Sequence, residues 1–349
     1  RQTGTLPGTR VYVNAGRELG QLDSLAGILS PGLLGAFVLL GLLPLVSRKL
    51  LDMLKARKVY AGWSKPKRFD RNLIVIGAGS GGLVSAYIAA AVKAKVTLIE
   101  KHRMGGDCLN TGCVPSKALI RSAKLAHEMG KAEQLGFRAV QAEVDFAAVM
   151  QRVQRVVADV EPHDSVERYT GLGVEVLQGE AKITSPWTVA VNGQVLSSRA
   201  IVIATGARPR LPQIPGIDLV APLTSDTVWE LREQPRRLLV LGGGPIGCEL
   251  AQAFQRLGSA VTLVQRGERL LPREDPEASA ALTGQMRADG VDLRLSYQTV
   301  RFELIEGERR LVCLDGGEQE VVLPFDQLLL ALGREANVSG FGAEELQLN

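Results

Sequence analysis

The sequence has few of the residues that build metal sites or disulfide scaffolds. Its 349 residues include four cysteines and three histidines. Four cysteines in a chain of this length do not make the disulfide framework of a small secreted protein. A zinc site at one cysteine pair would need further ligands, and only Cys248, Cys313 and scattered histidines remain to supply them. We therefore expect no resident metal ion and favour a catalytic or redox pair of cysteines.

Excess charge of one sign is also scarce. The formal net charge is +4, which is too small to indicate a nucleic-acid partner. A hydrophobic content of 46% together with 38 glycines is typical of a glycine-rich α/β protein, and the length allows two or three domains. The chain begins with Arg1 rather than Met and stops at Asn349 within what looks like a domain. We interpret it as an internal fragment of a longer protein.

The two remaining cysteines form the chemical centre of the chain. Cys108 and Cys113 stand in the stretch GGDCLNTGCVPSKAL, residues 105–119. Pro115 and the apolar spacing after it predict a helix that opens at Cys113, where the helix N-terminus would lower the pKa of the thiol. Cys108 is expected on the preceding loop, which can turn back through Asn110-Thr111-Gly112. A reversible dithiol is one reading; a structural disulfide, half of a zinc site and two unrelated thiols stay open.

A dinucleotide-binding pattern precedes the cysteines. Gly77, Gly79 and Gly82 form the series GxGxxG, and Glu100 follows 18 residues after the last glycine. Gly77 would allow a tight turn, Gly79 the approach of a diphosphate, and Gly82 close packing of helix on strand, while Glu100 would accept ribose hydroxyls. The surrounding pattern predicts a strand over 73–76, a helix over 83–93 and a strand over 96–99.

The same pattern occurs a second time. Gly242, Gly244 and Gly247 follow a predicted strand over 238–241 and open a helix that continues to residue 257. Gln265 ends the next strand at the position that Glu100 occupies in the first unit, and Arg266 comes directly after it. An arginine there can bind a 2′-phosphate, so we predict NADPH, with NADH possible. The alternative is that Arg266 is a solvated surface charge.

An apolar run near the beginning of the chain predicts a membrane helix over about 25–46. Basic residues follow it, which places everything after residue 47 on the cytoplasmic side. The alternative is a buried helix of a soluble protein, because residues 32–46, the cleanest stretch, are shorter than a full span. Residues 48–70 are predicted to be a basic linker that is either solvated or in contact with anionic lipid headgroups.

The segments between the two glycine patterns show no further catalytic signal. A long helix is predicted over roughly 146–169, and a hairpin over 188–196 turns at Asn192-Gly193. A strand over 200–203 leads into Ala204-Thr205-Gly206. We interpret all three histidines as surface or packing residues: His102, His127 and His163.

Taken together, these motifs resemble the flavin-dependent pyridine nucleotide–disulfide oxidoreductases, and within them mercuric reductase. The resemblance runs from about residue 72 to the end and rests on residues 77–82, 105–119, 204–209, 242–254, 273–276 and 331–334. It implies FAD in the first nucleotide fold and the nicotinamide nucleotide in the second. It also implies that Cys113 is the flavin-proximal thiol, that Cys108 attacks the substrate, and that Lys117 and Glu249 form an ion pair near the flavin.

The resemblance implies further cofactor-binding residues, and this sequence also departs from the family pattern. It implies cofactor contacts at Gly106, Asp107, Thr205, Gly206 and Gly333. The family's later Gly-Asp flavin motif, its C-terminal interface domain and its His-Glu acid–base pair are absent from this sequence. Ala336 stands where the family usually has Pro, and the metal-capturing cysteines of mercuric reductases are missing. Mercuric specificity is therefore in doubt, and the fragment alone is predicted to be inactive.

Residues 1–47 resemble the tail of the DedA/TVP38-type, or SNARE-associated, membrane domain. The matching residues are 6–9, 13–16 and the Leu-rich helix after them. This implies that the longer protein is held in the cell membrane with its flavoprotein part facing the cytoplasm.

The expected fold is α/β, with two doubly wound, Rossmann-like domains, the second inserted in the first. The expected domains are a membrane part (1–47), a linker (48–70), an FAD-binding domain (71–222), an NAD(P)-binding domain (223–333) and the start of the return to the first domain (334–349). The expected function is electron transfer from NAD(P)H through FAD and the Cys108–Cys113 disulfide to a disulfide or mercuric-ion-type acceptor, in a homodimer. A dihydrolipoamide dehydrogenase-like enzyme and a membrane transport or lipid-handling protein with a flavin redox sensor are the alternatives.

Overall fold

The computed structural model describes residues 13, 38, 41–42, 44–54, 60, 62–138 and 143–346. The chain divides into two compact units, residues 1–65 and 66–349. In the first unit the described residues 44–54 are helical. Over the described ranges, no helix is both long and apolar enough to cross a membrane. Most of the membrane helix predicted over 25–46 lies outside the described residues, so it stays a prediction.

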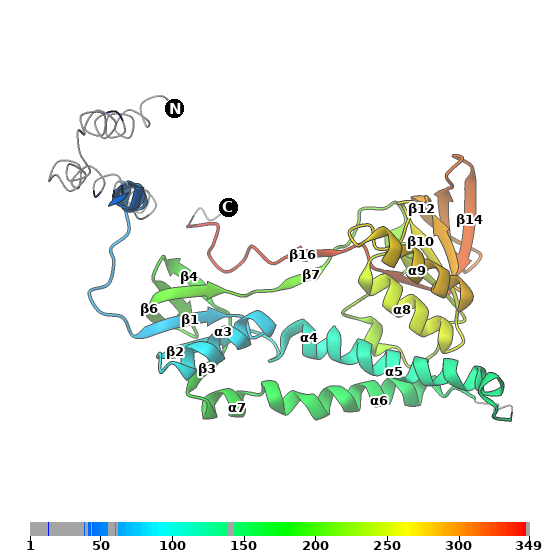
Figure 1. Cartoon of the computed structure of the whole chain (residues 1–349), viewed down its shortest axis with the longest axis horizontal. Helices are drawn as coiled ribbons and strands as arrows, with labels where there is room; N and C mark the ends of the chain where they lie inside the picture. Colours follow the sequence, from blue (N-terminus) through cyan, green and yellow to red (C-terminus); the bar gives the residue numbers. More distant parts are fainter. Residues whose placement is uncertain are drawn as a thin grey trace, which may run out of the picture. The chain divides into compact units, whose positions relative to one another are not determined.

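The second unit begins with a six-stranded sheet in the order β3-β2-β1-β6-β5-β4 (Figure 1). Strands β1, β2, β3 and β6 are parallel, and β4 and β5 are antiparallel. The predicted hairpin turn is confirmed, because Asn192 and Gly193 have φ of 50° and 76°, as a tight two-residue turn requires. The strands are β1 (Arg71–Ile76), β2 (Val96–Glu100), β3 (Val174–Gln178), β4 (Lys182–Ser185), β5 (Thr188–Val191) and β6 (Gln194–Ile203).

Helices separate the first strands. Helix α3 (Ser80–Ala91) joins β1 to β2, and a long excursion of helices joins β2 to β3. The excursion contains α4 (Gly106–Asn110), α5 (Cys113–Gly130), η2 (Ala132–Leu135), α6 (Phe146–Val160), η3 (Glu161–Asp164) and α7 (Val166–Gly171). The single helix predicted over 146–169 is therefore wrong. It is interrupted by the 3₁₀ turn that contains Pro162, and Ser165 caps α7 with its side chain.

A parallel sheet in the order β11-β10-β9-β15-β8 follows, and the antiparallel strands β12, β13 and β14 form a separate small sheet. The parallel strands are β8 (Leu223–Thr224), β9 (Arg237–Leu241), β10 (Ala260–Gln265), β11 (Asp292–Leu295) and β15 (Gln327–Leu330). The helical elements are η4 (Ile217–Leu219), η5 (Val228–Glu230), α8 (Pro245–Arg256) and α9 (Pro276–Ala288). The small sheet contains β12 (Gln298–Ile305), β13 (Glu308–Leu314) and β14 (Glu320–Phe325).

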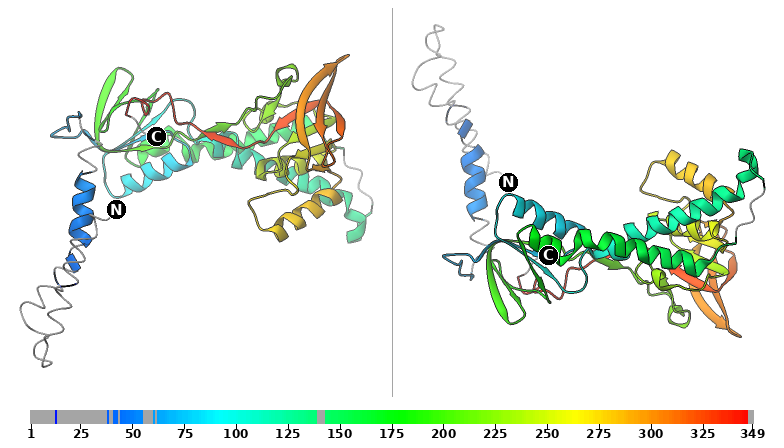
Figure 2. Two further views of the ribbon diagram at one scale, coloured as in Figure 1. Left: turned by 90° about the horizontal axis from the view of Figure 1, so that it is seen from above. Right: turned by 90° about the horizontal axis from the view of Figure 1, so that it is seen from below.

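One hydrophobic core joins the helical excursion to the second sheet. Helices α5 and α6 lie side by side, and α5 also packs on α8 (Figure 1 and Figure 2). Leu119 of α5, Met150 of α6 and Phe254 of α8 are fully buried in this cluster. The rings of Phe146 and Phe254 have centroids 5.8 Å apart. The helix that carries Cys113 is therefore held from both sides by apolar packing.

The end of the described chain runs back toward the first sheet. Strand β16 (Arg334–Ala336) pairs antiparallel with β7 (Ala207–Pro209). Phe341 then packs in the core of the first sheet, and its carbonyl accepts a hydrogen bond from the Ile183 amide at 2.7 Å. The insertion of the second domain in the first stays a prediction.

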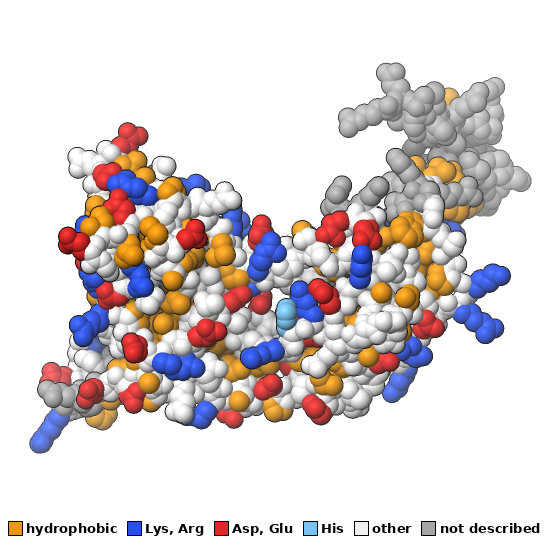
Figure 3. All heavy atoms as spheres, turned by 180° about the vertical axis from the view of Figure 1, so that it is seen from behind, with side chains coloured by type: hydrophobic (Ala, Val, Ile, Leu, Met, Phe, Trp, Pro, Cys, Tyr) orange, Lys and Arg blue, Asp and Glu red, His pale blue; other side chains and the backbone are white. Residues whose placement is uncertain are grey.

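Charges of both signs are interspersed over the face seen in Figure 3, and several meet as ion pairs. Arg237 at the start of β9, for example, pairs with Asp326 at 2.8 Å and with Glu308 at 3.2 Å.

Candidate active site

The first glycine turn has the geometry that its sequence predicts. Gly77 has φ +99°, and a Cβ there would lie 2.3 Å from the Ala204 carbonyl oxygen. A Cβ on Gly82 would lie 1.7 Å from the Gly77 carbonyl oxygen, so only glycine lets α3 approach β1 this closely. Gly79 is the N-cap of α3 and no side chain caps the helix. The free amide groups of its first turn can therefore bind an anion.

Glu100 at the end of β2 is 8% exposed and bonds to the same turn. One carboxylate oxygen accepts from the Ala78 amide at 2.6 Å, and the other accepts from the His102 amide at 2.8 Å. Each oxygen has a further lone pair, so the carboxylate can still accept from a ribose hydroxyl as predicted. Glu100 is thus both a brace for the turn and a candidate ligand group.

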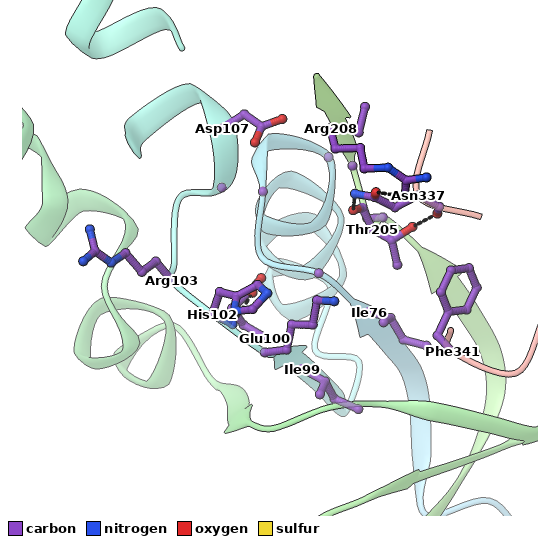
Figure 4. A pocket seen from close by; sticks show the side chains of 18 of the residues that line it. Ile76, Ile99, Glu100, His102, Arg103, Asp107, Thr205, Arg208, Asn337 and Phe341 are labelled. Carbon is purple, nitrogen blue, oxygen red and sulfur yellow. Dashed lines mark hydrogen bonds between the residues drawn. The ribbon is translucent and has the colours of Figure 1, made fainter. Parts of the chain in front are cut away.

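A cavity of about 780 Å³ opens beside this turn (Figure 4). Two glycines on its wall lie close together: a Cβ on Gly106 would lie 2.5 Å from the Cα of Gly79. The predicted site residues that line it are Gly77, Gly79, Glu100, Gly106, Asp107, Cys108, Thr205 and Gly206. Gly82 lies beneath the turn instead, where it serves helix packing.

Several lining residues were missed by the sequence analysis. His102, interpreted from sequence as a surface or packing residue, lies on the cavity wall beside Arg103, and Asn337 and Phe341 contribute from the chain after β16 (Figure 4). Asn337 donates to the Thr205 carbonyl at 2.9 Å, and its own carbonyl accepts from the Thr205 hydroxyl at 2.7 Å. The adjacency of His102 to Glu100 was an available signal, whereas nothing local marks Asn337.

The structure confirms a helix that opens at Cys113, with Gly112 as its N-cap. The expectation that Cys108 lies on a loop is wrong, because it lies in the short helix α4. Gly105, its N-cap, and Gly106, its first residue, have φ of 85° and 54°, which favour glycine at the start of this helix. Gly112 permits the close return, since a Cβ there would be 2.9 Å from the Asp107 carbonyl oxygen.

The two thiols are brought together. The pKa of Cys108 is raised to about 11. The largest cause is a hydrogen bond with the Cys113 side chain, and the next is burial of the thiol. Cys108 is half-buried and Cys113 is exposed. Among the described residues, no group of three or more His, Cys, Asp or Glu side chains is placed to hold a metal ion. Cys248 and Cys313 are both buried away from this pair, as expected of small packing residues.

The predicted ion pair between Lys117 and Glu249 is present. The ammonium lies 2.7 Å from a carboxylate oxygen of Glu249 and joins the first turns of α5 to α8. Their side chains are 60% and 40% exposed. An exposed pair of this kind stabilises a fold by only about 0–1 kcal/mol. Lys117 stands four residues after Cys113 on α5.

The second glycine turn repeats the first. Gly242 has φ +114°, and a Cβ on Gly247 would lie 1.9 Å from the Gly242 carbonyl oxygen. Gly244 is the N-cap of α8, again without a side-chain cap. The Gln265 side-chain oxygen accepts from the Gly243 amide at 3.0 Å. Arg266 is exposed and makes no ion pair with any described residue.

Gly333, the last predicted cofactor residue, has φ +99° and immediately precedes β16.

Two strand–glycine-turn–helix units with a pair of thiols beside the first are typical of dinucleotide-dependent thiol oxidoreductases. The chain belongs to the pyridine nucleotide-disulphide oxidoreductase family, whose model matches residues 71–349. Members of this family use FAD and a pyridine nucleotide.

Individual relatives agree on the family and differ in their named substrates. The chain is 38% identical to a mercuric reductase of Bacillus cereus over 76% of this chain and 42% of the relative. It is 35% identical to a glutathione reductase of Burkholderia cepacia over 81% and 61%. It is 30% identical to a dihydrolipoyl dehydrogenase of Bacillus subtilis over 80% and 62%. The chain thus spans only about half the length of the curated relatives it matches.

Solved structures are also similar. The HOCl-induced flavoprotein disulfide reductase RclA from Escherichia coli matches with a TM-score of 0.66 and 28% identity, over 78% of this chain and 59% of that chain.

Proposed function

We propose that this chain is the nucleotide-binding part of an FAD-dependent oxidoreductase that passes electrons from NADPH to a Cys108–Cys113 disulfide. One observation carries the proposal: a single cavity is lined both by the first glycine turn and by Cys108. A dinucleotide held by that turn would extend toward the thiol pair. The second turn supplies a separate site for the nicotinamide nucleotide.

The residues around the cavity fit FAD. The uncapped N-terminus of α3 offers amide groups to a diphosphate, and Glu100 offers a carboxylate oxygen to a ribose. Gly79 and Gly106 leave no side chain between the ligand and the backbone there. When bound, FAD would supply two-electron exchange between the nicotinamide and the disulfide.

The chain's own cysteines would complete the reaction. Two electrons and two protons convert the Cys108–Cys113 disulfide to two thiols. One thiolate then attacks an external disulfide, which forms a mixed disulfide with the protein and releases the first external thiol. The second cysteine attacks the protein sulfur of that mixed disulfide, so the internal bond re-forms and the second external thiol leaves. We assign the attack to Cys108 and the flavin-proximal place to Cys113. Cys108 lines the cavity and Cys113 is the more exposed thiol, so the flavin spectra of the two serine variants described below distinguish this order from the opposite one.

The acceptor is proposed to be a disulfide or a mercuric-type metal ion. Relatives named mercuric reductase and a Cu(II) complex of RclA support the metal ion, and the glutathione reductase relative supports the disulfide. Dihydrolipoamide is the second candidate, supported by the dihydrolipoyl dehydrogenases. NADPH oxidation by the full-length protein with each acceptor in turn would choose among them, and no turnover with any would favour a redox-sensing domain.

Three further proposals concern the longer protein: how its domains are connected, where it is located and how it assembles. The second domain would be inserted in the first, which the pairing of β16 with β7 supports. Residues 1–47 would attach the protein to the cell membrane, with the flavin part facing the cytoplasm. The longer protein would be a homodimer. Flotation of the full-length protein with and without residues 1–47, followed by sedimentation analysis in detergent, would test the last two.

Anaerobic titration of the full-length protein with NADPH, while the flavin spectrum is recorded, tests the central proposal. We expect a long-wavelength absorption band from a thiolate beside the flavin, and its loss in Cys113→Ser but not in Cys108→Ser. Flavin bleaching without such a band would mean that the cysteines are not coupled to the cofactor. Loss of the band in Cys108→Ser alone would reverse the two thiol roles.

A further inference from the structure

Arg334, the first residue of β16, contacts three separate segments around the cavity. One terminal nitrogen of its guanidinium lies 2.5 Å from an Asp107 carboxylate oxygen and donates to the Ala207 carbonyl at 2.5 Å. The other terminal nitrogen donates to the Ser225 hydroxyl at 3.1 Å and lies 3.4 Å from an Asp226 oxygen. The Arg334 side chain is 25% exposed, whereas those of Asp107 and Asp226 are 50% and 36% exposed, so both carboxylates remain open to the cavity.

The two carboxylates that it contacts both line the cavity. Asp107 lies in the first turn of α4, directly before Cys108, and Asp226 follows β8 in the second sheet. Burial raises the pKa of Asp107, the Arg334 charge lowers it, and the nearby Asp226 charge raises it. Without the arginine, two negative charges would face the place where the α3 N-terminus awaits a diphosphate.

A second contact joins the same segments. The Trp229 indole nitrogen donates to the Thr111 carbonyl at 2.8 Å and to the Ser225 carbonyl at 2.7 Å. Thr111 lies between the two cysteines, so the segment around residues 225–229 is fixed to the thiol-bearing turn at two points. Trp229 supplies a neutral contact, and Arg334 supplies the only charge among these contacts that can offset the carboxylates.

We propose that Arg334 is a positioning residue that neutralises Asp107 and Asp226, so that the cavity accepts a dianionic diphosphate while Cys108 is held against it. This inference rests on the proposed function and assigns a role to a residue that takes no part in the thiol chemistry. Removing the positive charge leaves two carboxylates facing the ligand. Removing the facing negative charge as well relieves that repulsion.

The chain offers a matched control in Arg208. It also lines the cavity and pairs with a single carboxylate, that of Glu335, at 3.2 Å. Its side chain is 57% exposed and donates a hydrogen bond to the Asn337 side-chain oxygen at 3.2 Å, so its charge is screened by solvent and contacts neither Asp107 nor Asp226. Substitution of Arg208 therefore removes the same formal charge from the same cavity and leaves the contacts of Asp107 and Asp226 with Arg334 in place.

The test is the dissociation constant of FAD from the full-length protein, measured after the cofactor has been removed and added back. We expect Arg334→Gln to weaken FAD binding roughly ten- to hundred-fold, and Arg208→Gln by less than about threefold. Adding Asp107→Asn to Arg334→Gln should restore affinity by about tenfold, because the repelling charge is gone. Circular dichroism and thermal unfolding of each variant show whether it is folded.

Salt provides a readout that simple structural damage would not move. Repulsion between Asp107 and a diphosphate is screened by salt, so the defect of Arg334→Gln should shrink as ionic strength rises from about 0.01 to 1 M. Equal affinities of Arg334→Gln and Arg208→Gln would overturn the inference, as would failure of Asp107→Asn to restore binding or a defect independent of salt. If the unaltered full-length protein binds no FAD, the proposed function is wrong and the inference falls with it.

Discussion

The two glycine turns have nearly the same backbone and end in different side chains. In each, the last glycine packs against the carbonyl of the first, and the residue that ends the second strand accepts a hydrogen bond from the turn. Glu100 does so with a carboxylate whose second oxygen takes the His102 amide. Gln265 does so with the one oxygen of its amide.

The difference shows that one side chain can stabilise the turn by a hydrogen bond without fixing which ligand the turn prefers. A carboxylate can brace the turn and still accept from a ribose hydroxyl, because each oxygen has two lone pairs. When the oxygen of a side-chain amide already accepts a hydrogen bond from the turn, the group that remains for the ligand is mainly its NH₂ donor. Beside Gln265, Arg266 pairs with no acidic residue in the described part of the chain and offers a positive charge. The first turn thus keeps carboxylate lone pairs for a hydroxyl donor, whereas the second presents an NH₂ donor and a positive charge.

Gly82→Ala should have the largest effect on this comparison. The added Cβ would lie 1.7 Å from the Gly77 carbonyl oxygen, so α3 must move off β1. We expect a loss of about 3 kcal/mol or more in the free energy of unfolding, together with loss of FAD. Gly81→Ala is the control, because nothing lies within 4 Å of its Cβ and alanine favours the helix. Similar urea midpoints for both variants would contradict the packing role.

Glu100→Gln should come next. An amide can accept from only one of the two amide groups that the carboxylate now satisfies, and its NH₂ would face the other. We expect FAD affinity to fall about tenfold or more, measured by fluorescence titration. The control is Glu180→Gln, an exposed carboxylate on the same cavity, which should change little. Equal effects would mean that only the net charge of the cavity matters.

Arg266→Ala tests the ligand preference of the second turn. If Arg266 binds a 2′-phosphate, the ratio of NADPH to NADH affinity should fall by about tenfold, with NADH binding nearly unchanged. Arg273, also exposed, provides the control substitution. The measurement is the dissociation constant of each nucleotide. An unchanged ratio would mean that Arg266 is a solvated surface charge.

The smallest expected effect is on stability, when one acidic residue in each sheet is substituted. Thr97 and Arg71 both bond Glu175 in the first sheet, whereas Thr262 and Arg294 contact Asp292 in the second. Partial burial raises the pKa of Glu175, but these hydrogen bonds outweigh it, so its pKa lies below the usual 4.5.

Glu175 therefore contributes stability that is present above pH 4.5 and is lost as pH falls through its lower folded pKa. We expect Glu175→Gln to lower stability at pH 7 by less than about 1 kcal/mol and to flatten the acid limb of the stability–pH curve. Thermal unfolding between pH 3 and 7 would show it, with Asp292→Asn as the matched substitution in the second sheet. An acid limb as steep in Glu175→Gln as in the unaltered protein would contradict the expectation.

Much of the fold was predictable because its signals are local. Each strand–turn–helix unit is encoded within about thirty residues by an apolar run, spaced glycines and a second apolar run. The helix at Cys113 and the turn at Asn192-Gly193 were predictable for the same reason. The break near Pro162 was missed, although proline is a local signal, because the apolar spacing continued past it.

Other features were beyond local reasoning. Helix α4 is five residues long, and its entry depends on Gly106 resting against Gly79, far away in the chain. The place of Asn337 on the cavity wall depends on the pairing of β16 with β7. No periodicity in either segment reports such a contact.

Local residue patterns specify the two glycine turns, the helix that opens at Cys113 and the kind of residue that ends each second strand. Contacts between distant charges come from the tertiary structure. The pair of Lys117 and Glu249, 132 residues apart, was implied by the family resemblance, whereas that of Asp107 and Arg334, 227 residues apart, was not predicted. Strand and helix patterns follow from steric and hydrophobic preferences over a few residues. Ion pairs across the fold instead depend on how whole sheets and helices pack, which no short stretch of the chain encodes.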